Sequence, residues 1–142
     1  MEKALSLARE AGAAGEVPVG AVIVRNGEII ATGKNGREIN KNALSHAEIE
    51  AINNACKELG SWRLDGCEMY VTLEPCPMCA GAIINARIKT LIFGAYDSKM
   101  GSIDSVINLC DYPYNHKVEV YGGICEDEAL AVLQDFFKDL RG

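Results

Sequence analysis

The sequence predicts an α/β protein, a three-layer α/β/α sandwich around a five-stranded mixed sheet. Two apolar runs flank an Asn-Gly turn near the start of the chain, which indicates an antiparallel hairpin. Strand-like and helix-like segments alternate after the hairpin, which indicates parallel strands joined by crossover helices. With 49% apolar and 24% charged residues in a length of 142, we expect one globular domain spanning residues 1–142.

The first elements are a helix and the hairpin. Residues 2–14 carry apolar side chains at helical spacing, at Ala4, Leu5, Ala8 and Ala11. The hairpin strands are residues 19–25 and 28–34, because the Asn26-Gly27 pair between them tolerates the positive φ angles of a type I′ turn. A polar loop, residues 35–44, follows.

The remaining elements alternate. A helix runs from Ser45 to about residue 59 and precedes a strand at 68–73; Pro77 opens a short helix that ends near residue 86. The last four elements predicted are a strand at 90–95, a short helix at 102–110, a strand at 117–122 and an amphipathic helix at 126–140.

Charge and hydropathy narrow the class of function. A formal net charge of −6 argues against a general nucleic-acid coat protein, whose affinity comes from a positive surface. A local basic patch that binds one shaped RNA stays open; taken singly, each basic residue is interpreted as solvated surface charge. The candidates for such a patch are Lys34, Arg37, Lys41, Arg63, Arg87, Lys89, Lys99 and Lys117.

No run approaches the roughly 20 apolar residues of a membrane span, and the first residues, MEKALSLAREAG, lack the apolar core of a signal peptide. We therefore expect a cytoplasmic protein without a membrane partner. In a reducing compartment, six cysteines indicate metal binding or catalysis rather than disulfides. Four of them are interpreted as small core residues: Cys56, Cys67, Cys110 and Cys125.

The other two cysteines, Cys76 and Cys79, belong to the segment EPCPMC at a strand end and a helix start. The positive end of the helix dipole favours the thiolate form, which binds metal. A structural zinc site needs four protein ligands, but the chain has no second Cys-x-x-Cys and only two histidines, His46 and His116. One histidine with both cysteines gives three ligands and an open position, the pattern of catalytic zinc.

His46 is the better candidate because of the segment Ser45-His46-Ala47-Glu48. With Ser45 as N-cap, His46 lies at the helix start, where it can share a site with Glu48. Ser45 and Glu48 also match a capping box, in which Glu48 would only bond a backbone N–H, and this motif alone leaves both interpretations open.

The combination is more specific. His-x-Glu followed by Pro-Cys-x-x-Cys is the signature of zinc deaminases. It predicts one zinc ion per subunit held by His46, Cys76 and Cys79, with Glu48 as the catalytic carboxylate. Zinc activates water in such sites, and Glu48 can carry the proton to a ring nitrogen and then to the leaving amine. Hydrolytic removal of an amine from a purine or pyrimidine fits these parts.

Nearly the whole chain from Glu16 onward resembles the bacterial tRNA-specific adenosine deaminases of the cytidine deaminase-like superfamily. The similar segments are EVPVGAVIV (16–24), Asn35, WRL (62–64), TLEPCPMCAGAI (72–83), ARI (86–88), FGAYDSKMG (93–101) and NHKVEV (115–120). The resemblance implies a zinc-dependent homodimer that binds the tRNA anticodon stem-loop and converts the wobble adenosine of an arginine tRNA to inosine. The substrate contacts that it implies are Asn35, Val19, Leu73, Glu74, Asp97 and Asn115.

Other interpretations stay open. Asn35 could be a loop amide that satisfies local backbone, and Asp97 a helix or turn cap. His116 is interpreted as structural or facing RNA. The protein could instead deaminate a free base or nucleoside such as guanine or cytosine. It could also be a binding module without catalysis, in which His116 or another cysteine supplies a fourth zinc ligand.

Overall fold

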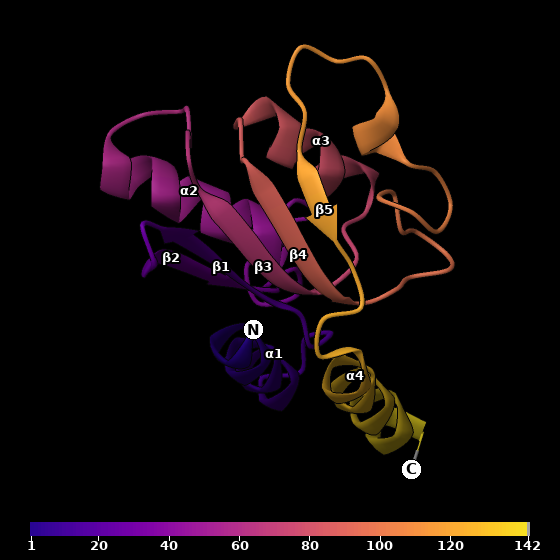
Figure 1. Cartoon of the computed structure of the whole chain (residues 1–142). Coiled ribbons are helices and arrows are strands. Elements are labelled where there is room, and N and C mark those ends of the chain that lie inside the picture. Colours follow the sequence, from indigo (N-terminus) through magenta and orange to yellow (C-terminus); the bar gives the residue numbers. More distant parts are fainter. Residues whose placement is uncertain (142) are drawn as a thin grey trace.

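The computed structural model describes residues 1–141. Its elements, in chain order, are α1 (Glu2–Ala13), β1 (Gly20–Arg25), β2 (Glu28–Lys34), α2 (Ala47–Leu59), β3 (Glu68–Leu73), α3 (Pro77–Asn85), β4 (Thr90–Ala95), the short 3₁₀ helix η1 (Leu109–Asp111), β5 (Glu119–Tyr121) and α4 (Glu126–Arg141). The five strands form one sheet in the order β2-β1-β3-β4-β5 (Figure 1). Strand β1 is antiparallel to both β2 and β3, whereas β3, β4 and β5 are parallel. The predicted mixed sheet is therefore confirmed.

Helices cover both faces of this sheet. Figure 1 shows α2 and α3 on one side of the strands and α1 with α4 on the other, which confirms the three-layer sandwich. Because β3, β4 and β5 are parallel, their carboxyl ends lie at one edge of the sheet, and β1 begins at that same edge beside the end of β3. Segments that follow β2, β3 and β4 therefore meet there.

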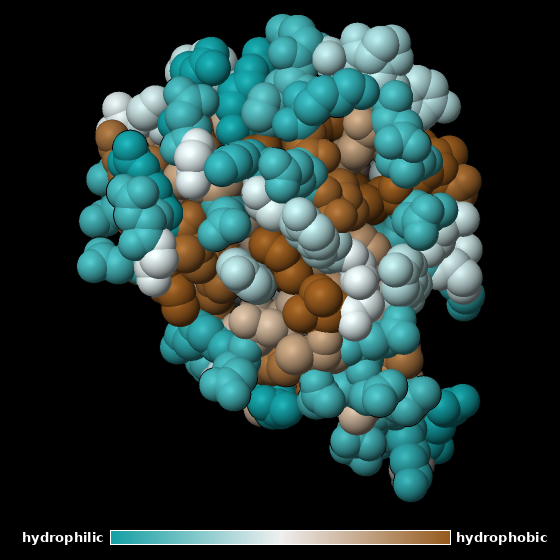
Figure 2. All heavy atoms as spheres, viewed as in Figure 1, coloured by the Kyte–Doolittle hydropathy of each residue, from teal (hydrophilic) through white to brown (hydrophobic). Residues whose placement is uncertain are grey.

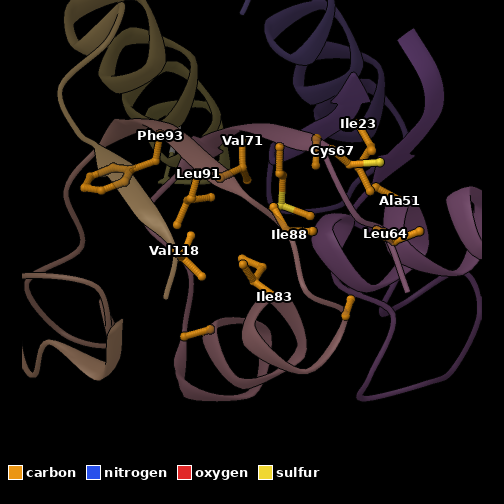
Figure 3. Packing of buried hydrophobic residues seen from close by; sticks show 14 of the residues in the cluster. Ile23, Ala51, Leu64, Cys67, Val71, Ile83, Ile88, Leu91, Phe93 and Val118 are labelled. Carbon is orange, nitrogen blue, oxygen red and sulfur yellow. The ribbon is translucent and has the colours of Figure 1, made fainter. Parts of the chain in front are cut away.

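The main core lies between the sheet and helices α2 and α3. Figure 3 shows Ile83 of α3 and Ile88 directed toward the sheet residues Val71 and Leu91. All four side chains are buried, and each contributes roughly 1.5–3 kcal/mol by leaving water. A smaller cluster on the opposite face joins Leu5 of α1 to the sheet and α4. Both helix layers are thus fixed to the sheet by apolar contacts.

Gly33 of β2 lets α2 approach the sheet closely. A Cβ atom at this position would collide with the backbone carbonyl oxygen of Ala47 and the backbone nitrogen of Ala51. Only a residue without a side chain allows the first turn of α2 to lie directly on the strand. Since His46 and Glu48 belong to that first turn, this contact sets how deep they lie.

The structure corrects three expectations. Residues 102–110 do not form one helix: residues 102–105 are turns, and only the short 3₁₀ helix η1 begins at Leu109. The backbone N–H groups of Val106 and Leu109 bond to the carbonyl oxygens of Gly101 and Ser102, five and seven positions back instead of four. Strand β5 is shorter than the predicted 117–122. All six cysteines are free thiols, and Cys67 and Cys110 are buried as expected, but Cys125 is exposed in the left-handed backbone region, with a φ angle of 57°.

Among residues 1–141, no helix is both long and apolar enough to span a membrane.

Candidate active site

A cavity of about 510 Å³ opens at the sheet edge where β3 and β4 end. Its lining comes from segments far apart in the chain: the loop after β2, the starts of α2 and α3, and the segment after β4. The lining residues are Val17, Val19, Asn35, Arg37, Ala43, His46, Ala47, Glu48, Leu73, Glu74, Cys76, Pro77, Met78, Asp97 and Met100. Clefts at the carboxyl ends of strands are the usual ligand sites of open α/β sheets.

His46, Cys76 and Cys79 come together at this cavity. His46 is the N-cap of α2 and Cys76 the N-cap of α3, so two helix starts converge. The Nδ1 atom of His46 lies 3.6 Å from the Sγ atoms of both Cys76 and Cys79. The three candidate ligand atoms all lie within 4.8 Å of one another.

The donor set fits zinc. Two sulfurs and one imidazole nitrogen are ligands that Zn²⁺ prefers, and this number leaves one tetrahedral position open. Within residues 1–141, this is the one group of three or more such side chains close enough to hold an ion. His116 does not join it, because its Nε2 atom lies 2.7 Å from the Ile88 carbonyl oxygen, where an N–H donates. Residues 1–141 therefore place no fourth His, Cys, Asp or Glu ligand with this group, as a closed structural site would require.

The capping-box interpretation of Ser45 and Glu48 is wrong. Helix α2 begins at Ala47 with His46 as N-cap, one residue later than expected, and no side chain caps it. The Ser45 hydroxyl instead donates to a carboxylate oxygen of Glu50, at 2.8 Å, and accepts from the side-chain amide of Asn40. Glu48 is thus free to face the cavity.

Glu48 is a buried acid at the base of the cavity, with 4% of its surface exposed. Burial raises the pKa of Glu48 to about 7; its own backbone N–H opposes the rise, and the charge on Cys76 adds to it. A carboxyl group whose pKa lies near neutrality can both accept and return a proton. The predicted role of Glu48 as proton carrier requires this property.

The two cysteines titrate as a pair. The Cys79 thiol donates to Cys76 and lowers the pKa of Cys76 to about 5. Burial acts in the opposite direction. The backbone N–H groups of Cys79 and Met78 and the nearby His46 lower this pKa further. The same shared hydrogen bond, together with burial, raises the pKa of Cys79. One thiolate is therefore already favoured at the start of α3, as its helix dipole predicts.

Asn35 lines the cavity but also serves the backbone. Its side-chain amide donates to the Val17 carbonyl oxygen at 3.1 Å, and its Oδ1 atom accepts from the backbone N–H of Arg37 at 3.3 Å. An amide has two N–H groups and two acceptor positions. One of each remains for a ligand, so local bonding and base recognition are compatible in Asn35.

Asp97 also lines the cavity, and its Oδ1 atom accepts from the backbone N–H groups of Lys99 and Met100. This is the turn-capping arrangement, so any ligand contact would use the second carboxylate oxygen. Val19 and Leu73 form apolar wall. Asn115 is exposed, and the structure does not bring it to the cavity of its own chain.

Some residues in and around the cavity were not named as substrate contacts from the sequence. Arg37 and Met100 line the cavity. Glu16 is fully buried, and its two carboxylate oxygens accept from the backbone N–H groups of Glu38 and Ile39, which fixes the loop after β2. The sequence did contain one signal for Glu16, because this acid opens the apolar segment EVPVGAVIV. A glutamate that is buried with such a segment almost always has hydrogen-bond partners.

Comparisons with known proteins relate the chain to deaminases. The MafB19-like deaminase family matches residues 1–141. A Bacillus subtilis protein named tRNA-specific adenosine deaminase is 48% identical, and the alignment covers 99% of this chain and 88% of that protein. A solved structure from work on A-to-I editing by tRNA:A34 deaminases superposes with a TM-score of 0.91 at 46% identity, covering 94% of this chain and 97% of that one. The guanine deaminase from Nitrosomonas europaea is more distant, with a TM-score of 0.79 at 27% identity, covering 95% of this chain and 81% of that one.

The sheet order, the His-Cys-Cys group and the buried glutamate beside it define a deaminase of the cytidine deaminase-like fold. Sequence identity over nearly the full chain then distinguishes between the kinds of deaminase: it is 46–48% to the tRNA deaminases and 27% to the guanine deaminase. The chain belongs to the family of tRNA-specific adenosine deaminases.

Proposed function

We propose that this enzyme is a zinc-dependent hydrolase that converts adenosine to inosine at the wobble position of a tRNA anticodon, that of an arginine tRNA. The observation that carries the proposal is that His46, Cys76 and Glu48 line one cavity, with the buried Cys79 completing the group of three candidate ligands. Relatives that are 46–48% identical and carry the names of tRNA deaminases support the choice of substrate. His46 Nδ1, Cys76 Sγ and Cys79 Sγ would hold the ion.

The reaction adds water at C6 of the base and breaks the C6–N bond, so that adenosine and water give inosine and ammonia. Zinc, when bound, supplies the Lewis acid that activates water. Glu48 accepts the proton that the water loses, because burial keeps its pKa near neutrality. Glu48 gives this proton to the ring nitrogen, then takes the second water-derived proton from the hydroxyl group now on C6 and gives it to the departing amine, which leaves as ammonia.

The cavity suits a single unstacked base. Val19 and Leu73 provide apolar surface for its faces, and the free N–H and acceptor of Asn35 provide polar contacts for its edge. A base in a single-stranded loop costs less to extrude than one in a duplex. An anticodon loop is therefore a substrate that such a cavity can take without melting a helix.

A homodimer is part of this proposal. Large apolar side chains are exposed in the segment that follows β4, namely Tyr96, Met100, Val106, Ile107, Tyr112 and Tyr114. Figure 2 shows hydrophobic surface on the side where this segment lies in Figure 1. A patch of this kind marks an interaction site. Asn115, next to Tyr114, would then reach the partner's cavity rather than its own.

The oligomeric state tests this part. We expect light scattering to give the mass of two chains, and Val106→Glu to give one chain, because Val106 is an apolar side chain of this segment that is 54% exposed. Ile29→Glu is the control, since Ile29 is equally exposed on the edge strand β2 but lies outside the patch. A wild-type monomer, or equal effects of the two changes, contradicts the proposed dimer.

The runner-up is deamination of a free base, supported by the likeness to a guanine deaminase at 27% identity. The same chemistry serves both substrates, so only the substrate distinguishes them. Incubation with the anticodon stem-loop, free guanine, free cytosine and adenosine decides the question. We expect inosine in the stem-loop and no ammonia from the free compounds; the reverse result would overturn the choice of tRNA.

A further inference from the structure

The carboxylate of Glu74 is enclosed by the segment that follows β4. Its Oε1 atom accepts from the backbone N–H of Asp97 at 3.0 Å and from the Ser105 hydroxyl. Its Oε2 atom accepts from the backbone N–H groups of Ile103, Asp104 and Ser105, at 3.2, 2.7 and 2.9 Å. Five hydrogen bonds thus join one side chain to both ends of residues 97–105.

This carboxylate lies in an unusual environment for an acid. Glu74 is 2% exposed, and within residues 1–141 no Lys, Arg or His lies within ion-pair distance of it. A buried charge without a counter-ion is stable only if hydrogen-bond donors surround it. The donors are the Ser105 hydroxyl and the backbone N–H groups of Asp97, Ile103, Asp104 and Ser105, so carboxylate and segment stabilise each other.

Gly101 belongs to the same arrangement. A Cβ atom at this position would collide with the Glu74 carboxylate and with the carbonyl oxygen of Asp97. The segment therefore passes so close to Glu74 that a side chain does not fit. A further bond, from the backbone N–H of Ser102 to the Pro75 carbonyl oxygen at 2.8 Å, ties the segment to the residue after Glu74.

We propose that Glu74 is a positioning residue that holds residues 97–105, one wall of the cavity, in fixed register with the metal-ligand segment at Cys76. Both oxygens of Glu74 are occupied by this wall, so the carboxylate does not recognise the base. Asp97 and Met100 line the cavity from the held segment, and Cys76 lies two residues after Glu74 in the chain. Glu74 thereby sets the distance between the substrate-binding wall and the reacting centre.

The inference rests on the proposed function only for its kinetic consequence, and hydrogen exchange tests the contact itself without any substrate. In Glu74→Gln, an amide group replaces one acceptor with a donor that faces N–H groups. We expect the amides of Ile103, Asp104 and Ser105 to exchange at least about tenfold faster. Ser105→Ala, a milder change, should accelerate exchange of the same amides less, and Ser98→Ala is the matched control, because Ser98 is exposed and makes no bond to Glu74.

Stem-loop affinity and kcat, measured separately, distinguish a positioning role of Glu74 from a role in the chemical step. For Glu74→Gln we expect affinity for the anticodon stem-loop, measured in a Glu48→Ala background, to fall about tenfold. We expect kcat, measured with Glu48 intact, to fall by a smaller factor, and bound zinc to stay at one per chain. Gly101→Ala should give the same pattern from the opposite side of the contact. Glu16→Gln, which releases the other loop, should leave exchange of the 103–105 amides unchanged.

Two results would overturn the proposal. One is unchanged exchange of these amides in Glu74→Gln, which would show that the contact does not hold the segment. The other is a loss of kcat at unchanged stem-loop affinity, which would place Glu74 in the chemical step. If the wild-type protein does not act on the stem-loop but Glu74→Gln still accelerates exchange of the 103–105 amides, the proposed substrate is wrong and the positioning role stands.

Discussion

The Nδ1 atom of His46 lies 3.6 Å from the Sγ atom of Cys76, although 30 positions separate these residues in the chain. The contact exists because α2 and α3 both begin at the same edge of the sheet, on the same face. Each helix supplies its N-cap residue, so the two positive helix ends converge on one point. Negative sulfur ligands are stabilised at such a point before any ion arrives.

Metal removal should change the reactivity of the cysteines selectively. After chelation, we expect iodoacetamide to modify Cys76, which is partly exposed and accepts hydrogen bonds as a thiolate. Burial raises the pKa of Cys67 and Cys110, which should stay unmodified. Peptide mass spectrometry measures this, and exposed Cys125 is the internal control that reacts in both states. Equal labelling of Cys76 with and without zinc contradicts the assigned ligand set.

Glu48→Gln should abolish activity without loss of metal. Loss of a general acid-base group costs about 10²–10⁴-fold in rate, and Glu48 lies outside the three-residue ligand group. Rates with the stem-loop and zinc content by elemental analysis are the two measurements. Glu58→Gln is the matched control, because Glu58 is exposed on the same helix. A Glu48→Gln enzyme that loses its zinc would show that this carboxylate is a ligand instead.

Gly33→Ala should destabilise the fold by about 1–3 kcal/mol, because the new methyl group collides with the backbone of α2. The displaced helix start carries His46 and Glu48, so activity should also fall. Urea unfolding gives the stability. Gly81→Ala in α3 is the control: a Cβ there meets nothing within 4 Å, and we expect a neutral or slightly stabilising effect of up to ~1 kcal/mol. Equal stability of the two variants would show that α2 is not tightly packed on β2.

RNA binding should depend on the basic residues at one end of the sheet only. Arg37 and Lys99 flank the cavity, whereas Lys89 and Lys117 precede β4 and β5 and so lie at the opposite end. For Arg37→Ala we expect weaker stem-loop binding and a salt-dependence slope reduced by about one. Lys89→Ala is the matched control and should change neither quantity. Loss of binding in the control would place the RNA on the other end of the molecule.

The sequence predicted the sheet and the grouping of His46, Cys76 and Cys79, because short motifs indicate both. The Asn26-Gly27 turn, the alternation of strands and helices, and the His46, Cys76 and Cys79 spacing each restrict the structure strongly. Glu48 was found in the same way, since its motif requires a short spacing from His46. These residues come together as predicted.

The segment after β4 could not be predicted for a physical reason. Residues 102–110 have helical periodicity, but hydrogen bonds to Glu74, 29 to 31 positions away, hold the first residues of this segment in turns. A tertiary contact of this kind leaves no mark in a local pattern. The same applies to Glu16 and to the exposed position of Cys125. Pocket walls built from such contacts were therefore named only through resemblance.

Sequencing of a tRNA pool after incubation with the enzyme tests the central claim most directly, because inosine is read as guanosine. We predict an adenosine-to-guanosine change at the wobble position of an arginine tRNA with the wild-type protein, and no change with Glu48→Ala. Unaltered tRNA in the presence of folded, zinc-loaded protein, or an equal change with Glu48→Ala, would contradict the account.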